Sequence, residues 1–252
     1  MTSFKDHFSK LAAQYASFRP TYPAALFEYL AATCTGHRLA WDCACGSAQA
    51  SVALAAHFET VIATDASAAQ IAAATAHPRI TYRVAPAEAS GLDAGCADLI
   101  TVAQALHWLD LPRFYAEALR VLRPGGVLAV WSYGPLRCEE PRIDARLAAF
   151  AVEVVGPYWP PERALVDSGY RTLGFPLPEL TPPGFLMQHR WELEPLLGYI
   201  RSWSATAGYT AAHGSDPVLA LAAQLEPLWG EARAAHVLFW PLAVRLGIKA
   251  AP

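Results

Sequence analysis

AWDCACGSAQAS, residues 40–51, joins a predicted strand to a predicted helix and sets the pattern that the following segments repeat. The apolar run Leu39–Cys43 predicts a short buried strand, and the alanine-rich run from Ala48 to Phe58 predicts a helix. The turn between them contains one glycine, Gly46. In an open α/β sheet a ligand binds outside the carboxyl ends of the strands, so this first strand-to-helix turn is a candidate ligand-binding loop.

Outward from this turn, strands and helices continue to alternate. Further strands are predicted at residues 61–64, 80–84, 97–103 and 127–133, and helices at 68–76 and 111–122. The second of these helices is followed by Pro124-Gly125-Gly126, which favours a chain break. Short apolar strands separated by helices predict a mostly parallel sheet with helices on both faces, which is the α/β class.

The pattern changes after Gly134. Helices are predicted at 143–155, 162–168, 196–206 and 217–229, and strands at 185–193 and 236–247, which makes seven strands in all. Residues 4–33 predict helices that are interrupted at Arg19–Pro23, because each proline forces the preceding residue out of the helical region.

The composition predicts one folded domain with a large core. With 252 residues, 54% hydrophobic and 16% charged, we expect one core domain that carries an insertion. A net charge of −3 gives no basic surface for nucleic acid. No apolar run at the N-terminus reads as a signal peptide, and no segment is long and apolar enough for a membrane, so we expect a cytoplasmic protein.

The five cysteines predict neither disulfides nor a metal site. Their number is odd and their spacing is scattered, which argues against a disulfide framework. Cys43 and Cys45 do not have the C-x-x-C spacing of zinc ligands, and no second pair lies at a useful distance. We therefore expect reduced thiols and no bound metal.

Asp65 follows the second predicted strand, 23 residues after Asp42. An acidic residue about 20 residues beyond such a turn typically accepts hydrogen bonds from ribose hydroxyls. Aspartate is also a common helix N-cap, which leaves a second interpretation open. Because the turn lies at the expected distance before Asp65, the ribose-binding interpretation of Asp65 is favoured. Alanines at 44 and 48 cost about 1 kcal/mol each if these positions need a positive φ, which a well-packed domain tolerates.

The segment Asp42-Cys-Ala-Cys-Gly-Ser-Ala-Gln49 resembles the D-x-G-C-G-T-G-Q loop of class I S-adenosylmethionine-dependent methyltransferases. Further matches follow in the family's order: TDAS at 64–67, PAEASGL at 86–92, ADLITVAQALHWLD at 97–110 and ALRVLRPGGVLAVW at 118–131. YASFRPTYP at 15–23, LLGYIRSWSATAGY at 196–209 and FWPLAVRLG at 239–247 are similar to the small-molecule branch that includes trans-aconitate and cantharidin methyltransferases. The chain departs from the family at Ala44, Ala48 and Pro86.

The resemblance implies a Rossmann-like, seven-stranded, mostly parallel sheet with an antiparallel last strand and helices on both faces. It also implies an N-terminal helical lid and a helical insertion after the fifth strand. The chain would then be a single methyltransferase domain over residues 1–252. Its parts would be the lid at 1–34, the cofactor-binding core at 35–135, a helical insertion or cap at 137–182, and C-terminal strands and helices at 184–252.

The resemblance further implies which residues bind the cofactor, S-adenosylmethionine. Asp42 and the backbone from Ala44 to Gly46 would lie near its methionine end, and Asp65 would hold the ribose. The adenine would lie beside Ala66 and the backbone of Ala87. Glu88 would bind its amino group, because Pro86 stands where many family members carry an acidic residue. Gln104 would face the reaction centre, and Tyr15 and Arg19 in the lid would close over the cofactor carboxylate.

For the methyl acceptor, the sequence offers one candidate catalytic residue and an aromatic pocket. His107 has a suitable titration range for a base, although a structural histidine packed beside Trp108 is an open alternative. Aromatic side chains, each of which is otherwise ordinary core packing, are candidate pocket walls: Tyr22, Trp108, Tyr133, Trp159 and Trp203. Candidate anchors for an anionic acceptor are His189, Arg190 and Arg201, with surface placement as the alternative.

Three functions remain open at this point. The first is methyl transfer to oxygen, nitrogen or carbon of a small molecule, by in-line displacement. The second keeps the fold and cofactor pocket for other chemistry or for binding alone, and is favoured only by the altered glycines. The third is a nicotinamide oxidoreductase, because Asp65 suits that ribose equally well, although the third glycine of its fingerprint is absent. We favour the first; the oligomeric state is not predicted.

Overall fold

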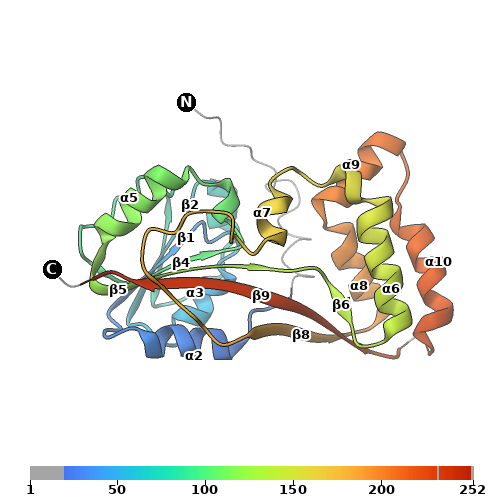
Figure 1. Ribbon diagram of the computed structural model, residues 1–252, viewed down its shortest axis with the longest axis horizontal. Coiled ribbons are helices and arrows are strands. Elements are labelled where there is room, and N and C mark those ends of the chain that lie inside the picture. Colours follow the sequence, from blue (N-terminus) through green and yellow to red (C-terminus); the bar gives the residue numbers. More distant parts are fainter. Residues whose placement is uncertain (1–19, 232, 251–252) are drawn as a thin grey trace.

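The computed structural model describes residues 20–231 and 233–250. Its centre is one sheet, in which nine strands are found among the described residues, in the order β3-β2-β1-β4-β5-β9-β6, with β7 and β8 also paired to β9 (Figure 1). The strands are β1 Leu39–Cys43, β2 Thr60–Asp65, β3 Ile80–Val84, β4 Ala97–Ala103, β5 Leu122–Tyr133, β6 Arg137–Cys138, β7 Glu179–Leu180, β8 Phe185–Trp191 and β9 His236–Ile248.

The strand directions confirm the predicted sheet. β1 to β5 are parallel to one another. β9 is antiparallel to β5 and to its other three partners, so it is the strand that runs against the rest. All seven predicted strands are present. The two further strands, β6 and β7, have two residues each and pair only with the long β9.

Helices cover both faces of the sheet because neighbouring strand residues point to opposite sides. α2 (Ala24–Thr33) and α3 (Gln49–Leu54) pack their leucines on one face, against Leu99 and Val127. α5 (Leu111–Val121) packs Phe114 on the other face, together with α7 (Arg163–Asp167). α4 (Ala68–Ala73) follows β2. These elements and β1–β5 form what we call the sheet half.

The second half is helical and is joined to the first by the long strands. α6 (Pro141–Ala149), α8 (Leu193–Arg201), α9 (Ser204–His213) and α10 (Val218–Trp229) lie together at the end of β8 and β9 that is remote from α5 (Figure 1). Leu147, Leu196 and Leu225 share a core there with Trp240 of β9. Short helical turns complete it: the π-helix η2 Phe150–Val154 and η3 Gly156–Tyr158. We call this the helical half. The turn η1 Leu106–Trp108 follows β4 and belongs to the sheet half.

The single helix predicted over 196–206 is wrong, because the chain forms two helices there. The hydroxyl of Ser202 donates to the Tyr199 carbonyl at 2.6 Å, and that of Thr206 donates to the Ile200 carbonyl at 2.8 Å. These side chains satisfy carbonyls that a continuing helix would have paired, so the chain can turn at the extended Trp203 before α9 begins.

Other predicted boundaries hold to within a few residues, with α3 and α4 shorter than expected. The segment Pro124-Gly125-Gly126 lies inside β5, beside a register shift against β4, and the helix before it ends at Val121. Of the predicted lid, α2 is described, whereas residues 1–19 lie outside the described residues. Within residues 20–231 and 233–250, no helix is long and apolar enough to cross a bilayer.

Candidate active site

The turn after β1 has a strained backbone in the region that glycine favours. Ala44, Gly46 and Ala48 have φ values of 55°, 53° and 68°. The two alanines therefore adopt the left-handed conformation that glycine favours, at roughly 1 kcal/mol each. Non-glycine residues in this region are uncommon and cluster at functional sites. The four in the described residues are Ala44, Ala48, Gln104 and Tyr170, and the first three follow the carboxyl ends of β1 and β4.

The turn is held to the end of β2 by two hydrogen bonds and is closed by a third within the turn itself. The Cys45 amide donates to the Thr64 carbonyl at 3.0 Å, and the Ala48 amide donates to the Cys45 carbonyl at 2.9 Å. The Gly46 amide donates to Oδ2 of Asp65 at 2.9 Å. The Asp65 carboxylate thus fixes the turn as well as standing at the end of its own strand.

Asp65 accepts a hydrogen bond from the start of the next helical segment, and its ribose role stays a prediction. Its Oδ1 accepts from the Ser67 amide at 2.8 Å, in the manner of a cap, and Ser67 is the N-cap of α4. The carboxylate is only half-buried and lies at the same edge as the turn. Its orientation is fixed by backbone groups, and an ionised carboxylate has acceptor positions for about four hydrogen bonds. A ribose role therefore stays compatible with the cap role.

Asp42 lies beneath the turn and is fully buried. Its two oxygens accept from the hydroxyls of Ser51 at 2.5 Å and Thr101 at 2.8 Å. Burial raises the pKa of this carboxyl to about 6, although the two hydroxyls oppose the rise and Asp65 adds to it. The carboxyl ties β1 to α3 and β4, and the structure does not bring it to the surface of the turn.

Of the residues predicted to contact the adenine, Ala87 and Glu88 lie on the segment after β3, and Ala66 follows β2. The Ala85 amide donates to the Asp65 carbonyl at 3.0 Å, Ala87 is buried, and Glu88 accepts from the Asp110 amide at 3.0 Å. Ala66 is exposed at the same edge. These positions agree with the predicted grouping, in which the segments after β2 and β3 lie side by side.

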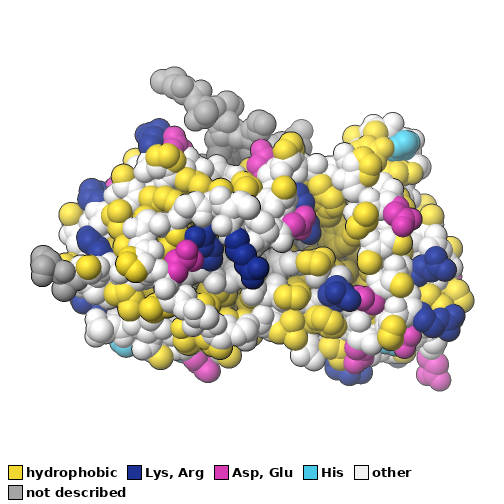
Figure 2. Space-filling view, viewed as in Figure 1, with side chains coloured by type: hydrophobic (Ala, Val, Ile, Leu, Met, Phe, Trp, Pro, Cys, Tyr) yellow, Lys and Arg dark blue, Asp and Glu magenta, His cyan; other side chains and the backbone are white. Residues whose placement is uncertain are grey.

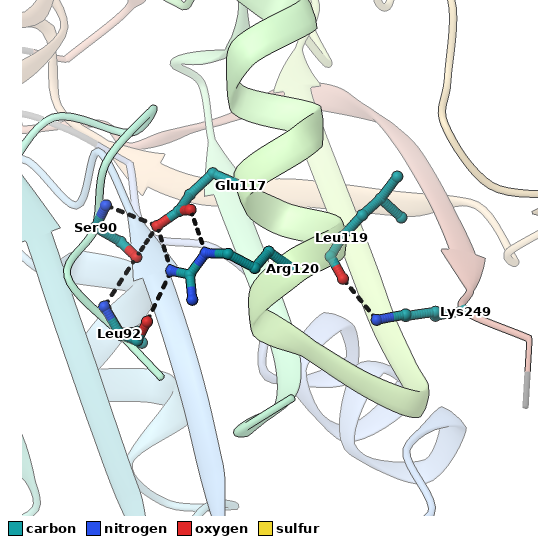
Figure 3. Close-up of polar contacts among 6 residues, drawn as sticks. All are labelled: Ser90, Leu92, Glu117, Leu119, Arg120 and Lys249. Atoms are coloured by element: carbon teal, nitrogen blue, oxygen red, sulfur yellow. Dashed lines mark hydrogen bonds and ion pairs between the residues drawn. The ribbon is translucent and has the colours of Figure 1, made fainter. Parts of the chain in front are cut away.

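An ion pair fixes the rest of that segment (Figure 3). Glu117 on α5 accepts from the amide and hydroxyl of Ser90, at 2.9 and 2.5 Å, and from Arg120 at 2.7 Å. Arg120 also donates to the Leu92 carbonyl at 2.7 Å. The Arg120 guanidinium and then Ser90 hold the pKa of Glu117 at about 2, against the effect of burial. At the end of α5, Lys249 donates to the Leu119 and Leu122 carbonyls.

Gln104 follows the last residue of β4 and forms hydrogen bonds to β5. Its φ is 54°, its amide donates to the Trp131 carbonyl at 2.8 Å, and its Oε1 accepts from the Tyr133 amide at 2.8 Å. The side chain therefore braces the two strand ends that lie next to the turn. Three residues further on, η1 carries His107.

His107 is mostly buried and contacts a tyrosine that the sequence analysis missed. Its Nδ1 lies 2.8 Å from the hydroxyl of Tyr170, and its ring packs against Trp108 with centroids 4.6 Å apart. Burial lowers the pKa of His107 to about 4, and the nearby charges of Glu162 and Arg163 act in opposite directions. The imidazole is therefore neutral at physiological pH.

Tyr170 is fully buried just beyond α7, with a φ of 61°. Its backbone carbonyl, with that of Leu173, accepts from the Arg245 guanidinium of β9, which also pairs with Glu179. Burial raises the pKa of its phenol, and the phenols of Tyr22 and Tyr133 add to the rise. Gly169 precedes it with a φ of 61°, and a glycine at this position indicates the end of a helix. The sequence has no pattern that indicates a contact between the following tyrosine and His107.

The predicted aromatic pocket falls into two groups. Tyr22, Tyr133 and Trp108 lie around the Tyr170–His107 pair, and Tyr22 packs edge-on against Trp131 at 5.5 Å. Trp203 lies in the helical half, 5.5 Å from Trp159, whose ring carries the Arg163 guanidinium at 4.3 Å. Figure 2 shows a hollow between the two halves in which mostly hydrophobic side chains are exposed.

The three candidate anchors for an anion have structural partners. Arg190 donates to the Ala235 carbonyl at 2.8 Å, and Arg201 pairs with Asp216 at 2.9 Å. His189 accepts from the Thr21 amide at 2.9 Å. These contacts favour the structural alternative for all three. Tyr15 and Arg19, the predicted lid residues, lie outside the described residues.

The residues at this edge fit a nucleoside-type cofactor. A Cβ built on Gly46 would meet no atom within 4 Å, so the space beside the turn is open. The turn, Asp65 and the exposed Ala66 face the same edge of the sheet. In the part of the chain that the structure describes, no three His, Cys, Asp or Glu side chains are grouped as a metal site.

Comparison with known proteins identifies the family. Residues 41–130 match the methyltransferase domain family. A Dictyostelium discoideum protein named as a methyltransferase is 36% identical over 219 residues, which cover 85% of this chain and 83% of the relative. A solved structure from Anaeromyxobacter dehalogenans, described as a type II methyltransferase, is 44% identical with a TM-score of 0.89, over 92% of this chain and 99% of that one.

A third relative is CRG1 of Saccharomyces cerevisiae, named as an S-adenosylmethionine-dependent methyltransferase, which is 29% identical over 48% of this chain and 45% of its own length. The chain therefore belongs to the methyltransferase family and is a methyltransferase, and the family implies S-adenosylmethionine as the methyl donor. The resemblance found in the sequence is confirmed, and the nicotinamide oxidoreductase is set aside.

Proposed function

We propose that this methyltransferase transfers a methyl group to a small-molecule acceptor held in the hollow between the sheet half and the helical half. One observation carries the proposal. The glycine-like turn at residues 44–48 is bonded to Asp65 at the strand edge where Gln104 also ends its strand. A cofactor held by the turn would thus lie next to Gln104 and the segment that carries His107.

For the cofactor, we assign direct contact to the turn at Ala44 and Gly46 and to Asp65 for the ribose. Ala66, Ala87 and Glu88 are assigned to the adenine, and Gln104 to the methyl-bearing end. Asp42, which is enclosed, supports the turn from below through Ser51. Tyr15 and Arg19 are kept as the proposed lid contacts to the cofactor carboxylate.

When bound, S-adenosylmethionine supplies an electrophilic methyl group, so the protein has to align a nucleophile with it. Alignment alone lowers a barrier by about 7–11 kcal/mol where the geometry is tight. We assign His107, which follows β4 beside Gln104, to the acceptor as its polar contact. With a pKa of about 4 it is a weak base at neutral pH, which favours acceptors that need positioning over those that need strong proton removal.

The acceptor's apolar part is assigned to aromatic side chains from both halves. Tyr22, Trp108 and Tyr133 would contact it from the sheet half, and Trp203 from the helical half. Such pockets are apolar with a few polar groups that fix orientation, which is the balance that this assignment requires.

A methyl-transfer assay tests the proposal. The protein is incubated with S-adenosylmethionine that carries a labelled methyl group and with pools of carboxylic acids, phenols, amines and carbon acids. We expect one pool to yield a labelled small molecule, and Gln104→Ala to reduce its formation by about 10-fold or more. Label recovered on protein or nucleic acid, with none of the pools active, would contradict a small-molecule acceptor.

A further inference from the structure

The contact between His107 and Tyr170 joins two chain segments that are 63 residues apart. His107 lies in η1 after β4, and Tyr170 lies beyond α7 with its backbone held by Arg245. The phenol is fully buried, and the distance from its oxygen to Nδ1 of His107 is 2.8 Å. A buried phenol and a half-buried imidazole at this distance share one hydrogen, and which atom carries it decides the chemistry of His107.

The surroundings of Tyr170 decide the direction of this hydrogen bond. If Nδ1 carried the hydrogen of this contact, the hydrogen of the buried phenol would be left without an acceptor, which is costly. Among the described residues, the phenol has no acceptor for its own hydrogen except Nδ1 of His107. A buried hydroxyl places its hydrogen on an available acceptor, so Tyr170 donates and Nδ1 accepts.

A neutral imidazole carries its hydrogen on one nitrogen only. Since Nδ1 accepts, the hydrogen is on Nε2, and within the described part of the chain Nε2 has no hydrogen-bond partner. We propose that Tyr170 is a positioning residue that holds His107 in the Nε2–H tautomer, so that His107 donates a hydrogen bond to the methyl acceptor and does not remove a proton from it.

This inference rests on the proposed function for its last part and narrows the acceptor by chemistry. The acceptor presents an oxygen or nitrogen that receives the Nε2–H bond, and its reacting atom has a lone pair that is available without a base from the protein. The backbone of Tyr170 has a positive φ, and Arg245 donates to its carbonyl. Both features fix the backbone of Tyr170 and so keep its phenol against Nδ1 of His107.

Nitrogen NMR of the histidine-labelled protein tests the tautomer directly. The signals of His107 are assigned by their loss in His107→Gln. We expect the wild type to show a protonated Nε2 and an unprotonated, hydrogen-bonded Nδ1. In Tyr170→Phe, which keeps the ring and loses the hydroxyl, we expect a mixture of tautomers. A protonated Nδ1 in the wild type, or an unchanged His107 in Tyr170→Phe, would overturn the proposal.

Tyr115→Phe is the matched control. Its hydroxyl donates to the Gly174 carbonyl at 2.9 Å, so the variant removes one phenol bond to the same segment without touching His107. We expect its His107 signals to match the wild type. Once an acceptor is known, Tyr170→Phe should lower kcat by about 10-fold, which is less than the roughly 100-fold or greater loss on removing such a donor outright, because part of the population keeps the Nε2–H tautomer. Its affinity for S-adenosylhomocysteine should stay unchanged.

The readouts separate the two levels of the proposal. If the wild type binds no S-adenosylhomocysteine, the proposed function fails while the tautomer is still measured. If the cofactor product binds and the tautomer is Nε2–H, but Tyr170→Phe and Tyr115→Phe have equal kcat, the role of Tyr170 in positioning is wrong. If Tyr170→Phe does not fold, the wild-type spectrum alone decides the tautomer.

Discussion

The two sides of the candidate site are built in different ways. On the cofactor side, carboxylates at strand ends bind backbone amides and hydroxyls, as Asp65 binds Gly46 and Asp42 binds Ser51. On the proposed acceptor side, the imidazole of His107 lies against the rings of Trp108 and Tyr170, and Tyr170 comes from a segment 63 residues further along the chain. The cofactor side is therefore organised by short loops that follow strands of the sheet, whereas the acceptor side depends on contacts between distant segments.

The largest expected effect is on the cofactor side. Asp65→Ala removes the proposed ribose acceptor and also the anchor of the Gly46 amide, so we expect the Kd for S-adenosylhomocysteine to rise by about 100-fold. Titration calorimetry measures it. Asp93→Ala, an exposed loop carboxylate, is the control and should bind as the wild type does. If both variants bind equally well, the ribose assignment is wrong.

The buried Asp42 should make stability depend on pH. Its folded pKa of about 6 lies above the unfolded value of 3.8, so its contribution is most favourable at low pH and is lost as pH rises through about 6. Between about pH 4 and pH 7, we expect the wild type to lose ~2 kcal/mol of unfolding free energy through this carboxyl. Asp42→Asn has no such carboxyl and should not show this loss. Urea unfolding at both ends of the range measures it.

Asp93→Asn is the matched control for this measurement and should keep the wild-type pH dependence. A wild type and an Asp42→Asn variant whose stabilities change in parallel with pH would show that the Asp42 carboxyl is already ionised at low pH.

The turn at Ala44 and Ala48 offers a smaller effect of the opposite sign. Replacing both alanines by glycine relieves two positive-φ positions, so we expect a gain of about 1 kcal/mol in unfolding free energy and cofactor affinity within about threefold of the wild type. Ala53→Gly, inside α3, should instead lose roughly 1 kcal/mol. A large loss of binding in the double variant would mean that the two methyl groups contact the cofactor.

The smallest effect lies on the acceptor side. Trp203→Phe trims a proposed pocket wall, so we expect the acceptor KM to rise about fivefold with unchanged cofactor affinity. Trp229→Phe alters a buried ring of α10 that packs on His236, and should lower stability without changing KM. Equal KM values for the two variants would place the acceptor away from the helical half.

The same difference explains what the sequence could predict. The seven strands and the turn follow from apolar runs and their spacing, and Ala44 and Ala48 show the positive φ that the family's glycines imply. Tyr170 could not be found, because its contact with His107 depends on how α7 packs on the sheet and on Arg245 from β9. The break at Ser202 was missed because hydroxyl bonds to nearby carbonyls compete with a helix without altering the apolar pattern.

The most direct test of the account is titration calorimetry of the whole protein with S-adenosylmethionine, S-adenosylhomocysteine and NADH. We expect both adenosyl compounds to bind with micromolar affinity, because the turn keeps its glycine-like backbone and its bond to Asp65, and we expect no heat from NADH. Absence of binding to both adenosyl compounds would contradict the account, since it would show that the alanine-substituted turn no longer holds the cofactor.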